Sequence, residues 1–340
     1  MKTPMILETI TPEKLNKFII AKHPEANFLQ SSSWGKVYEL TGDQVHYLGL
    51  IENDKLVGVC LAIVKPAKRG RYLEIPGGPL IDWESSSQVK ATFKSLKQLA
   101  AKENCVFIRI RPNIPDTAEN QKILKQNDLH PSPMHLHAQH TVVIDLTRPE
   151  DQLLADMRRQ TRYEVRRASK LNIKVTSSSE TAAFKEFYQV QLATAKRQNF
   201  IPSSEAFIIA QHEAFQNQAK IYKAELDGKA LAYGLILLQA PEAIYHEAAS
   251  TPEGLHLPGA YALQWQVIQD AKSLGLKRYN LFGIAPPGQP HHRYAGVTTF
   301  KTGFGGTEVN YLPAHDLVVD PVKYQITKMI EIMRKKKRNL

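Results

Sequence analysis

The sequence predicts an α+β fold built from two copies of one domain, because two sets of elements recur along the chain. A polar turn leading into an apolar strand occupies residues 52–64 and again 225–238. A helix, a turn and a strand occupy residues 93–112 and again 263–284. Both repeats are offset by about 170 residues, which indicates a tandem duplication. The order lacks the strict strand–helix alternation of a doubly wound parallel sheet.

Each copy is expected to contain, in order, a helix, antiparallel strands, a second helix and a further strand. The boundary falls where DLTRPEDQ follows the strand QHTVVIDL. We therefore expect domain 1 at residues 1–147 and domain 2 at residues 148–320. The stretch from Pro321, VKYQITKMIEIMRKKKRNL, has a helical pattern. We expect helix 321–340 to return to domain 1.

Composition limits the class of protein and its location. The 340 residues carry a net charge of +11, which favours binding to nucleic acid, nucleotide-linked substrates or an anionic membrane face. Cys60 and Cys105 lie in apolar runs and are expected to be buried, reduced thiols. The N-terminus lacks the apolar core of a signal peptide, and the run LAYGLILLQA is too short to span a bilayer. A cytoplasmic protein with no transmembrane segment is predicted, and peripheral membrane contact is compatible with its charge.

Nucleotide and metal motifs are weak. The sequence contains no dinucleotide-binding glycine motif and no Walker A motif. HLPGAYA stands where an acyl-CoA transferase would hold the pyrophosphate, without the usual glycine spacing, which disfavours CoA as the donor. Alternation places His135 and His137 on one strand face, near His140, but no carboxylate or cysteine completes a ligand set. We predict no metal site.

A basic helix is predicted within residues 157–175. Helical spacing places four basic residues on one stripe, and Glu164 is the acid that interrupts the surrounding run. Phosphate binding is the favoured interpretation over a solvated charged face. The basic stripe consists of Arg159, Arg162, Arg166 and Lys170.

The segment from Tyr245 to Tyr311 suggests an acyl-transfer site. It contains an amphipathic helix, an apolar strand and a glycine-rich turn entered through Phe300 and Lys301. A lysine between an apolar strand and such a turn is poorly placed for an uncommitted charge. Because this turn has no counterpart in the first copy, the chemistry is predicted to lie in the second domain.

Six motifs occur in the order seen in FemABX peptidyltransferases, and the chain resembles this family over nearly its whole length. The motifs are FLQSSSWGKVYEL, RYEVRRASK, ATAKRQNF, YHEAAS, WQVIQDAKSLGLKRYNLFGI and FKTGFGG. The resemblance implies a tandem pair of GNAT-like domains, in agreement with the duplication. Nothing between Lys196 and Ala230 is long enough for the helical hairpin of some members, so the chain resembles the compact, FemX-like type.

The resemblance implies an aminoacyltransferase in interpeptide-bridge synthesis. The donor would be aminoacyl-tRNA, and the acceptor would be the amine of stem-peptide residue 3 of UDP-MurNAc-pentapeptide or lipid II. No cofactor is implied. The basic stripe would contact tRNA. Trp34, Lys36, Arg197 and Tyr245 would form the acceptor site, with Lys36 and Arg197 on the diphosphate and Tyr245 lining the channel.

Phe300 and Lys301 match the dipeptide that the family places at the reaction centre. We expect Lys301 to stabilise the oxyanion of a tetrahedral intermediate. Asp316 and Glu247 are candidate general bases, while the acceptor's own carboxylate or the leaving ribose oxygen could also move the proton. Two other functions stay open from the sequence: an acyl-CoA-dependent N-acyltransferase of GNAT type, and a non-catalytic protein that binds tRNA or the precursor.

Overall fold

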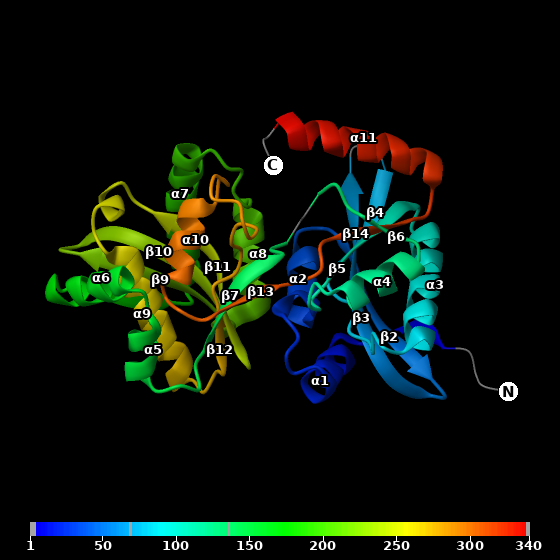
Figure 1. Cartoon of the computed structure of the whole chain (residues 1–340), viewed down its shortest axis with the longest axis horizontal. Coiled ribbons are helices and arrows are strands. Elements are labelled where there is room, and N and C mark those ends of the chain that lie inside the picture. The colour runs from blue at the N-terminus through cyan, green and yellow to red at the C-terminus, as the bar shows by residue number, and fades with distance from the viewer. Residues whose placement is uncertain (1–4, 68–69, 135–136, 338–340) are drawn as a thin grey trace. The chain divides into compact units, whose positions relative to one another are not determined.

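The computed structural model describes residues 5–67, 70–134 and 137–337. The chain forms two compact units, each containing a seven-stranded sheet (Figure 1). The first unit consists of Met1–Gln139 and Asn310–Leu340, and the second consists of His140–Val309.

The first unit has the sheet order β1-β2-β3-β4-β5-β14-β6. β4 and β5 run parallel, and each of the other neighbouring pairs is antiparallel. Its elements are β1 (Ile6–Thr9), α1 (Pro12–Lys22), η1 (Phe28–Gln30), α2 (Ser32–Leu40), β2 (Gln44–Glu52), β3 (Lys55–Ala67), β4 (Gly70–Gly77), α3 (Ser86–Lys102), β5 (Cys105–Pro112), α4 (Ala118–Gln126), β6 (Leu129–Pro131), β14 (His315–Val318) and α11 (Pro321–Lys337).

The second unit has the sheet order β13-β7-β12-β11-β10-β9-β8, in which β11 and β12 run parallel. Its elements are β7 (His140–Asp145), α5 (Glu150–Asp156), α6 (Arg159–Lys170), β8 (Lys174–Ser178), α7 (Thr181–Gln198), α8 (Glu205–Phe215), η2 (Gln216–Gln218), β9 (Ala219–Leu226), β10 (Lys229–Gln239), β11 (Glu242–Ser250), η3 (Glu253–Leu255), α9 (Gly259–Ser273), β12 (Arg278–Asn280), α10 (Ala295–Thr302) and β13 (Thr307–Asn310).

The two sheets share one topology, so the predicted α+β duplication is confirmed. Read from β8 to β13, the second sheet repeats the first sheet read from β1 to β6. The hairpin β2–β3 matches β9–β10. Helix α3 connects the parallel strands β4 and β5, and helix α9 connects β11 and β12 in the same way.

Hydroxyl side chains fix the starts of several helices in the first unit. Thr11, Ser31, Ser85 and Thr117 each accept a hydrogen bond from the backbone N–H three residues ahead. Such a cap satisfies a donor that the helix itself leaves unpaired. The sequence thereby sets where α1, α2, α3 and α4 begin.

The units divide at different points from the expected boundaries at residues 147 and 320. Strand β7 follows β6 in the chain but pairs with β12 of the second sheet. Strand β14 follows β13 but lies between β5 and β6 of the first sheet. The first sheet is thus completed by a strand from beyond its continuous segment, while β7, which the expected boundary assigned to domain 1, belongs to the second sheet. Helix α11 belongs to the first unit, where Glu331 accepts hydrogen bonds from Arg109 of β5.

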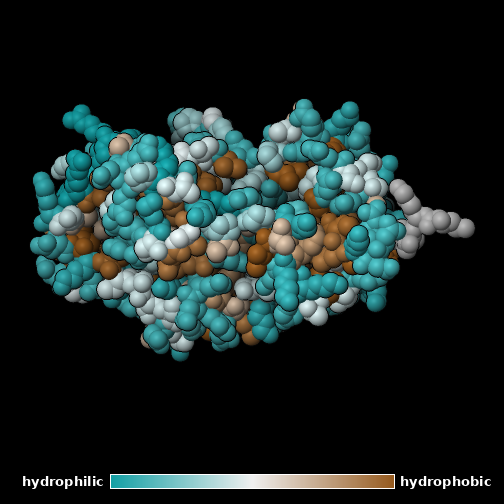
Figure 2. All heavy atoms as spheres, turned by 90° about the horizontal axis from the view of Figure 1, so that it is seen from below, coloured by the Kyte–Doolittle hydropathy of each residue, from teal (hydrophilic) through white to brown (hydrophobic). Residues whose placement is uncertain are grey.

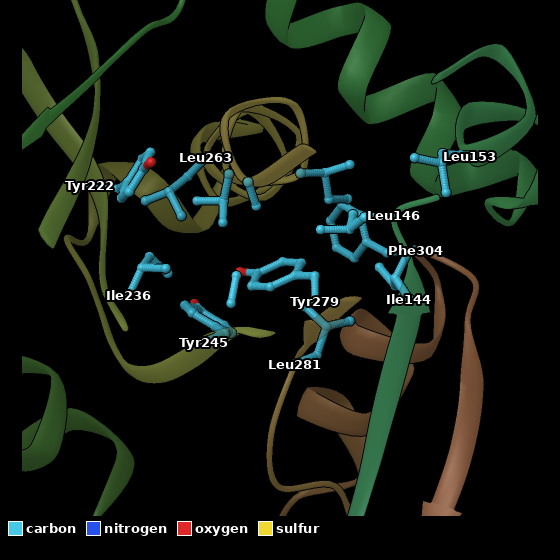
Figure 3. Packing of buried hydrophobic residues seen from close by; sticks show 14 of the residues in the cluster. Ile144, Leu146, Leu153, Tyr222, Ile236, Tyr245, Leu263, Tyr279, Leu281 and Phe304 are labelled. Carbon is cyan, nitrogen blue, oxygen red and sulfur yellow. The ribbon is translucent and has the colours of Figure 1, made fainter. Parts of the chain in front are cut away.

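The core of the second unit surrounds Tyr279 of β12, whose ring lies between side chains of the sheet and of α9 (Figure 3). Its hydroxyl donates to Oε1 of Gln264 on α9 at 2.7 Å, so the buried phenol has a polar partner. Tyr245 and Leu263 lie on one side of this ring, and Leu146 and Phe304 lie on the other. The core therefore joins the strand that carries Tyr245 to the turn that follows α10.

One face of the protein is mainly polar. Figure 2 shows one face, on which hydrophilic residues surround smaller hydrophobic patches. Among the exposed large apolar side chains, five lie on α11: Val322, Ile326, Met329, Ile332 and Met333. Within the described ranges, no helix combines the length and apolar character needed to cross a bilayer.

Candidate active site

Lys301 lies in the last turn of α10, where its side chain is buried. We expected it to enter a glycine-rich turn directly; the structure places it in a helix that immediately precedes this turn. The residue is 9% exposed, and its Nζ donates to the backbone oxygen of Gly283 at 2.8 Å. The same Nζ lies 5.5 Å from the ring centroid of Tyr245. Burial lowers the pKa of Lys301 to about 7, so its charged and neutral forms are both populated near neutral pH.

The loop after β12 presents the carbonyl that Lys301 contacts. Phe282 has a positive φ of 58°, and its N–H donates to Oδ1 of Asn280 at 2.9 Å. A residue with a side chain is uncommon in this region, and such conformations gather at functional sites. The turn at Phe282 directs the chain so that the oxygen of Gly283 meets Lys301.

Glycines after α10 allow it to approach the sheet. Gly305 and Gly306 have φ values of 84° and 88°, which favour glycine. A Cβ at Gly306 would lie 2.6 Å from the backbone oxygen of Val143, so only glycine fits against β7. The predicted glycine-rich turn therefore has a steric purpose, which is to hold the end of α10.

A pocket of about 330 Å³ opens beside Lys301. Phe300 lines it and packs edge-on against Tyr261 and Phe304, with ring centroids 5.1 Å apart in both pairs. Tyr245 is also buried, and burial raises the pKa of its hydroxyl. The predicted residues Tyr245, Phe300 and Lys301 thus line one pocket. Its lining is Tyr245, His246, Glu247, Ala248, Gly296, Val297, Phe300 and Lys301.

Arg197 lies in the last turn of α7. Its Nη2 donates to the backbone oxygen of Ser250 at 2.7 Å and to Oγ of Ser250 at 2.9 Å. Within the described residues its Nε has no hydrogen-bond partner. The guanidinium is therefore anchored at the end of β11 and retains a donor for another group.

Trp34 and Lys36 belong to α2 of the first unit. Trp34 is buried and packs edge-on against Phe28 and Tyr38, at centroid distances of 5.0 and 5.4 Å. Lys36 is exposed, and its Nζ lies 3.3 Å from Oε2 of Glu39. The packing of Trp34 fixes the helix that presents Lys36 to solvent.

The basic stripe lies on α6, so the predicted helix is confirmed. Arg162 is partly buried and donates from Nη1 to the backbone oxygens of Ala155 and Met157. It therefore satisfies carbonyls at the end of α5. Arg159, Arg166 and Lys170 are exposed. Three members of the stripe are thus open to solvent, while the fourth secures the helix that precedes it.

Of the two candidate bases, Asp316 is occupied elsewhere. It lies in β14, fully buried, and accepts from Nε and Nη2 of Arg109 at 2.8 and 2.9 Å. The hydroxyl of Tyr324 donates to it at 3.1 Å. These bonds give Asp316 a structural role in the core of the first unit. Glu247 is the candidate that lines the pocket.

The histidines do not assemble a metal site among the residues the structure describes. There, no three side chains of His, Cys, Asp or Glu gather closely enough to hold a metal ion. His137 lies with Nε2 2.7 Å from Oε1 of Glu74. His135, the other residue of the predicted pair, lies outside the described ranges.

Sequence reasoning missed His246, Ala248, Gly296 and Val297 as lining residues. Neighbouring residues of a regular strand point to opposite faces, so YHEAAS gave no signal that four successive positions share a pocket. The lining by Gly296 and Val297 depends on α10, which the glycine-rich pattern did not reveal.

Comparisons with known proteins agree on the family. The FemAB family model matches residues 10–132, 132–233 and 227–332. The aminoacyltransferase FemA of Staphylococcus epidermidis is 19% identical in an alignment that spans 391 residues with its gaps. The alignment covers 88% of this chain and 93% of that protein.

Solved structures agree on the fold. A crystal structure of FemX superposes with a TM-score of 0.84 at 17% identity, over 95% of this chain and 100% of that one. A tandem GNAT protein from the clavulanic acid biosynthesis pathway superposes with a TM-score of 0.56 at 10% identity, over 93% and 98%. The two units are therefore a tandem GNAT-like pair, the chain belongs to the FemAB family, and it is an aminoacyltransferase.

Proposed function

We propose that the protein transfers an amino acid from aminoacyl-tRNA to the amine of stem-peptide residue 3 of a peptidoglycan precursor. The precursor is UDP-MurNAc-pentapeptide or lipid II, and the product belongs to the interpeptide bridge. The observation that carries this proposal is the buried Lys301 at the wall of a pocket that also contains a carboxylate. Membership of an aminoacyltransferase family supports the reaction class.

The reaction needs no cofactor, because the aminoacyl ester is already activated. The acceptor amine attacks the ester carbonyl, and the carbonyl oxygen becomes negative in the tetrahedral intermediate. This attack forms the C–N bond; when the intermediate collapses, the C=O bond is restored, the C–O bond to the ribose breaks, and an amide remains. The proton lost by the amine passes to the ribose oxygen, which leaves as a hydroxyl.

Lys301 stabilises the negative oxygen. Because its pKa is about 7, developing negative charge beside Nζ favours the ammonium form when it is needed. In a buried pocket such a charge–charge contact is stronger than in water. The bond to the Gly283 oxygen holds the amine in place without neutralising it.

Cations outside the pocket bind the two substrates. Lys36 and the partly engaged fork of Arg197 contact the diphosphate of the acceptor. Arg159, Arg166 and Lys170 contact tRNA phosphates from the exposed face of α6. Arg197→Met is expected to weaken calorimetric binding of UDP-MurNAc-pentapeptide, and unchanged affinity would remove Arg197 from this role.

The test incubates the protein with a mixture of aminoacyl-tRNAs and UDP-MurNAc-pentapeptide, and with the same tRNAs and lipid II in parallel. Mass spectrometry should show a product heavier by one aminoacyl residue, and the added mass identifies the amino acid. A matched reaction contains acetyl-CoA in place of tRNA. Acetylation without tRNA, or no product with any tRNA, would refute the proposal.

A further inference from the structure

Glu247 enters the Lys301 pocket because β11 contains a bulge. In the pairing with β10, Leu235 faces Glu247 and Ile236 faces Tyr245, which leaves His246 as the extra residue. Bulges redirect side chains and often occur beside active sites. Tyr245, His246 and Glu247 consequently all line the pocket.

The carboxylate of Glu247 is held in place by neutral donors. Gln191 donates through Nε2 to Oε2, while Ser203 and Gln211 donate to Oε1 at 3.0 and 3.2 Å. The side chain is 13% exposed, and Nε2 of His246 lies 3.8 Å from Oε1. No lysine or arginine within the described ranges forms an ion pair with it. A fixed carboxylate of this kind has capacity for a cationic partner.

We propose that Glu247 binds a primary ammonium group of a reactant. This rests on the proposed function, in which two such groups come to the pocket. One is the α-ammonium of the aminoacyl ester, which is attached to the carbon next to the reacting carbonyl. The other is the side-chain ammonium of the acceptor before it loses its proton. In either case Lys301 faces the oxygen that becomes negative and Glu247 faces the nitrogen that is positive.

Glu247→Gln removes the charge with little change of shape. Oε1 of Gln191 and Oε1 of Gln211 have no hydrogen-bond partner within the described residues. Rotation of either amide would offer an acceptor to the new N–H group. The variant should therefore fold, which thermal unfolding verifies. Glu242→Gln is the matched control, because Glu242 is a buried carboxylate of the same strand that accepts from a cation, Nε of Arg278 at 2.9 Å, as well as from Nδ2 of Asn280 at 3.3 Å.

The donor arm compares an aminoacyl-tRNA with the same tRNA carrying the corresponding α-hydroxyacyl ester. The wild-type enzyme should prefer the ammonium-bearing donor in kcat/KM by about 10- to 100-fold, the usual range for one hydrogen bond to a charged group. Glu247→Gln should bring this ratio close to one.

The acceptor arm uses calorimetry, which needs no turnover and stays informative if transfer fails. It compares UDP-MurNAc-pentapeptide containing lysine at residue 3 with the norleucine analogue. If Glu247→Gln loses the wild-type preference for the ammonium-bearing donor, the bound ammonium belongs to the aminoacyl group. If it loses the preference for the lysine-containing precursor, the bound ammonium belongs to the acceptor. If Glu247→Gln keeps both wild-type ratios, the ammonium site is refuted. If the wild-type protein transfers nothing, the proposed function fails separately.

A second inference rests on α11, whose exposed face is apolar. Val322, Ile326, Met329 and Met333 are 74%, 51%, 64% and 58% exposed, and their spacing places them on one stripe. The opposite face packs on the first unit through Tyr324. The helix thus turns an apolar stripe toward solvent.

The charge of α11 identifies the partner that fits this stripe. The helix sequence contains six basic residues and one acid, Glu331, which Arg109 engages. Apolar side chains combined with lysine and arginine are typical of helices that lie in the interface of an anionic bilayer. We propose that α11 docks the protein on an anionic lipid surface. The basic residues are Lys323, Lys328, Arg334, Lys335, Lys336 and Lys337.

Vesicle sedimentation tests this docking surface. The full-length protein should bind vesicles that contain phosphatidylglycerol and bind phosphatidylcholine vesicles weakly. The double variant Ile326→Gln, Met329→Gln should lower the partition coefficient by about 10²-fold, because two exposed apolar side chains no longer enter the interface. The control Leu274→Gln alters an equally exposed residue of the second unit and should change nothing.

Three outcomes would overturn the proposal. The first is wild-type vesicle binding by the double variant. The second is a dimer in sedimentation velocity that this variant abolishes, which would make the stripe a contact between copies of the chain. The third is a double variant that loses affinity for tRNA while its vesicle binding stays unchanged.

Discussion

Replacing Lys301 with methionine should make the protein more stable at low pH and much less active. Burial lowers the pKa of Lys301 from its ordinary value of 10.5 to about 7. Below pH 7 both folded and unfolded chains are protonated there, and the folded state carries the full cost of a buried charge. As pH rises from 7 to 10.5, the unfolded chain binds more protons than the folded chain, so that cost declines.

The magnitude follows from the two pKa values. The cost of charging Lys301 in the folded state is about 5 kcal/mol at pH 6 and about 2 kcal/mol at pH 9. Methionine removes this cost at every pH but leaves the Gly283 oxygen without its donor, a penalty of about 1–3 kcal/mol. Lys301→Met should therefore exceed the wild type in free energy of unfolding at pH 6 and approach it at pH 9.

Urea unfolding at pH 6 and pH 9 measures this difference. Trp265 reports on the second unit, and 5-fluorotryptophan with ¹⁹F NMR separates it from Trp34 and Trp83 of the first unit. The control Lys36→Met changes an exposed lysine and should show no such pH dependence. Turnover of Lys301→Met should fall by about 10²–10³. Parallel stability curves for the variant and the wild type would refute the buried charge, and near-normal turnover would refute its role in transfer.

Three further predictions concern the basic helix, the acceptor site and the turn after α10. Arg166→Glu should raise KM for aminoacyl-tRNA and flatten the salt dependence of KM, with the melting temperature unchanged. Arg162→Gln should instead lower the melting temperature, because its hydrogen bonds to backbone oxygens are lost. Equal effects of the two variants on KM and on the melting temperature would contradict these separate roles. Lys36→Met should weaken calorimetric binding of UDP-MurNAc-pentapeptide about tenfold, and an unchanged Kd would exclude the diphosphate contact. Gly306→Ala should lower the free energy of unfolding by about 2–4 kcal/mol in thermal unfolding, because the new Cβ would meet a backbone oxygen. The control Gly288→Ala adds a Cβ to open space and should lower the free energy of unfolding by about 1 kcal/mol.

The duplication was predictable because each repeated element has a recognisable pattern of apolar and polar residues along the chain. Hairpin β2–β3 and its copy β9–β10 combine apolar runs with a polar turn, so neighbouring residues define them. The placement of β7 and β14 was not predictable, because pairing between strands far apart in the chain leaves no local signal. β14 contains four residues, and its partners in β5 lie about 200 positions earlier.

Several residues of the candidate pocket were predictable from the sequence, and their arrangement was not. Lys301 stands out because a charge among apolar residues needs a partner, and the structure supplies a carbonyl. The sequence did not reveal that Arg162 binds backbone oxygens, since its helical spacing matches that of Arg166. Nor did it distinguish Asp316 from Glu247, because the partners of a carboxylate depend on distant segments.

Those two carboxylates have different kinds of partner in the duplicated units. In the first unit Asp316 is matched by the bidentate guanidinium of Arg109, so its charge is fully used within the protein. In the second unit Glu247 accepts from neutral side chains, and Lys301 donates to a neutral carbonyl. Opposite charges that are fixed in one pocket by dipoles keep their field for a substrate. An aminoacyl ester would offer such a pair, a nascent oxyanion and an ammonium on adjacent carbons, and it is one of the two reactants between which the proposed test of Glu247 decides.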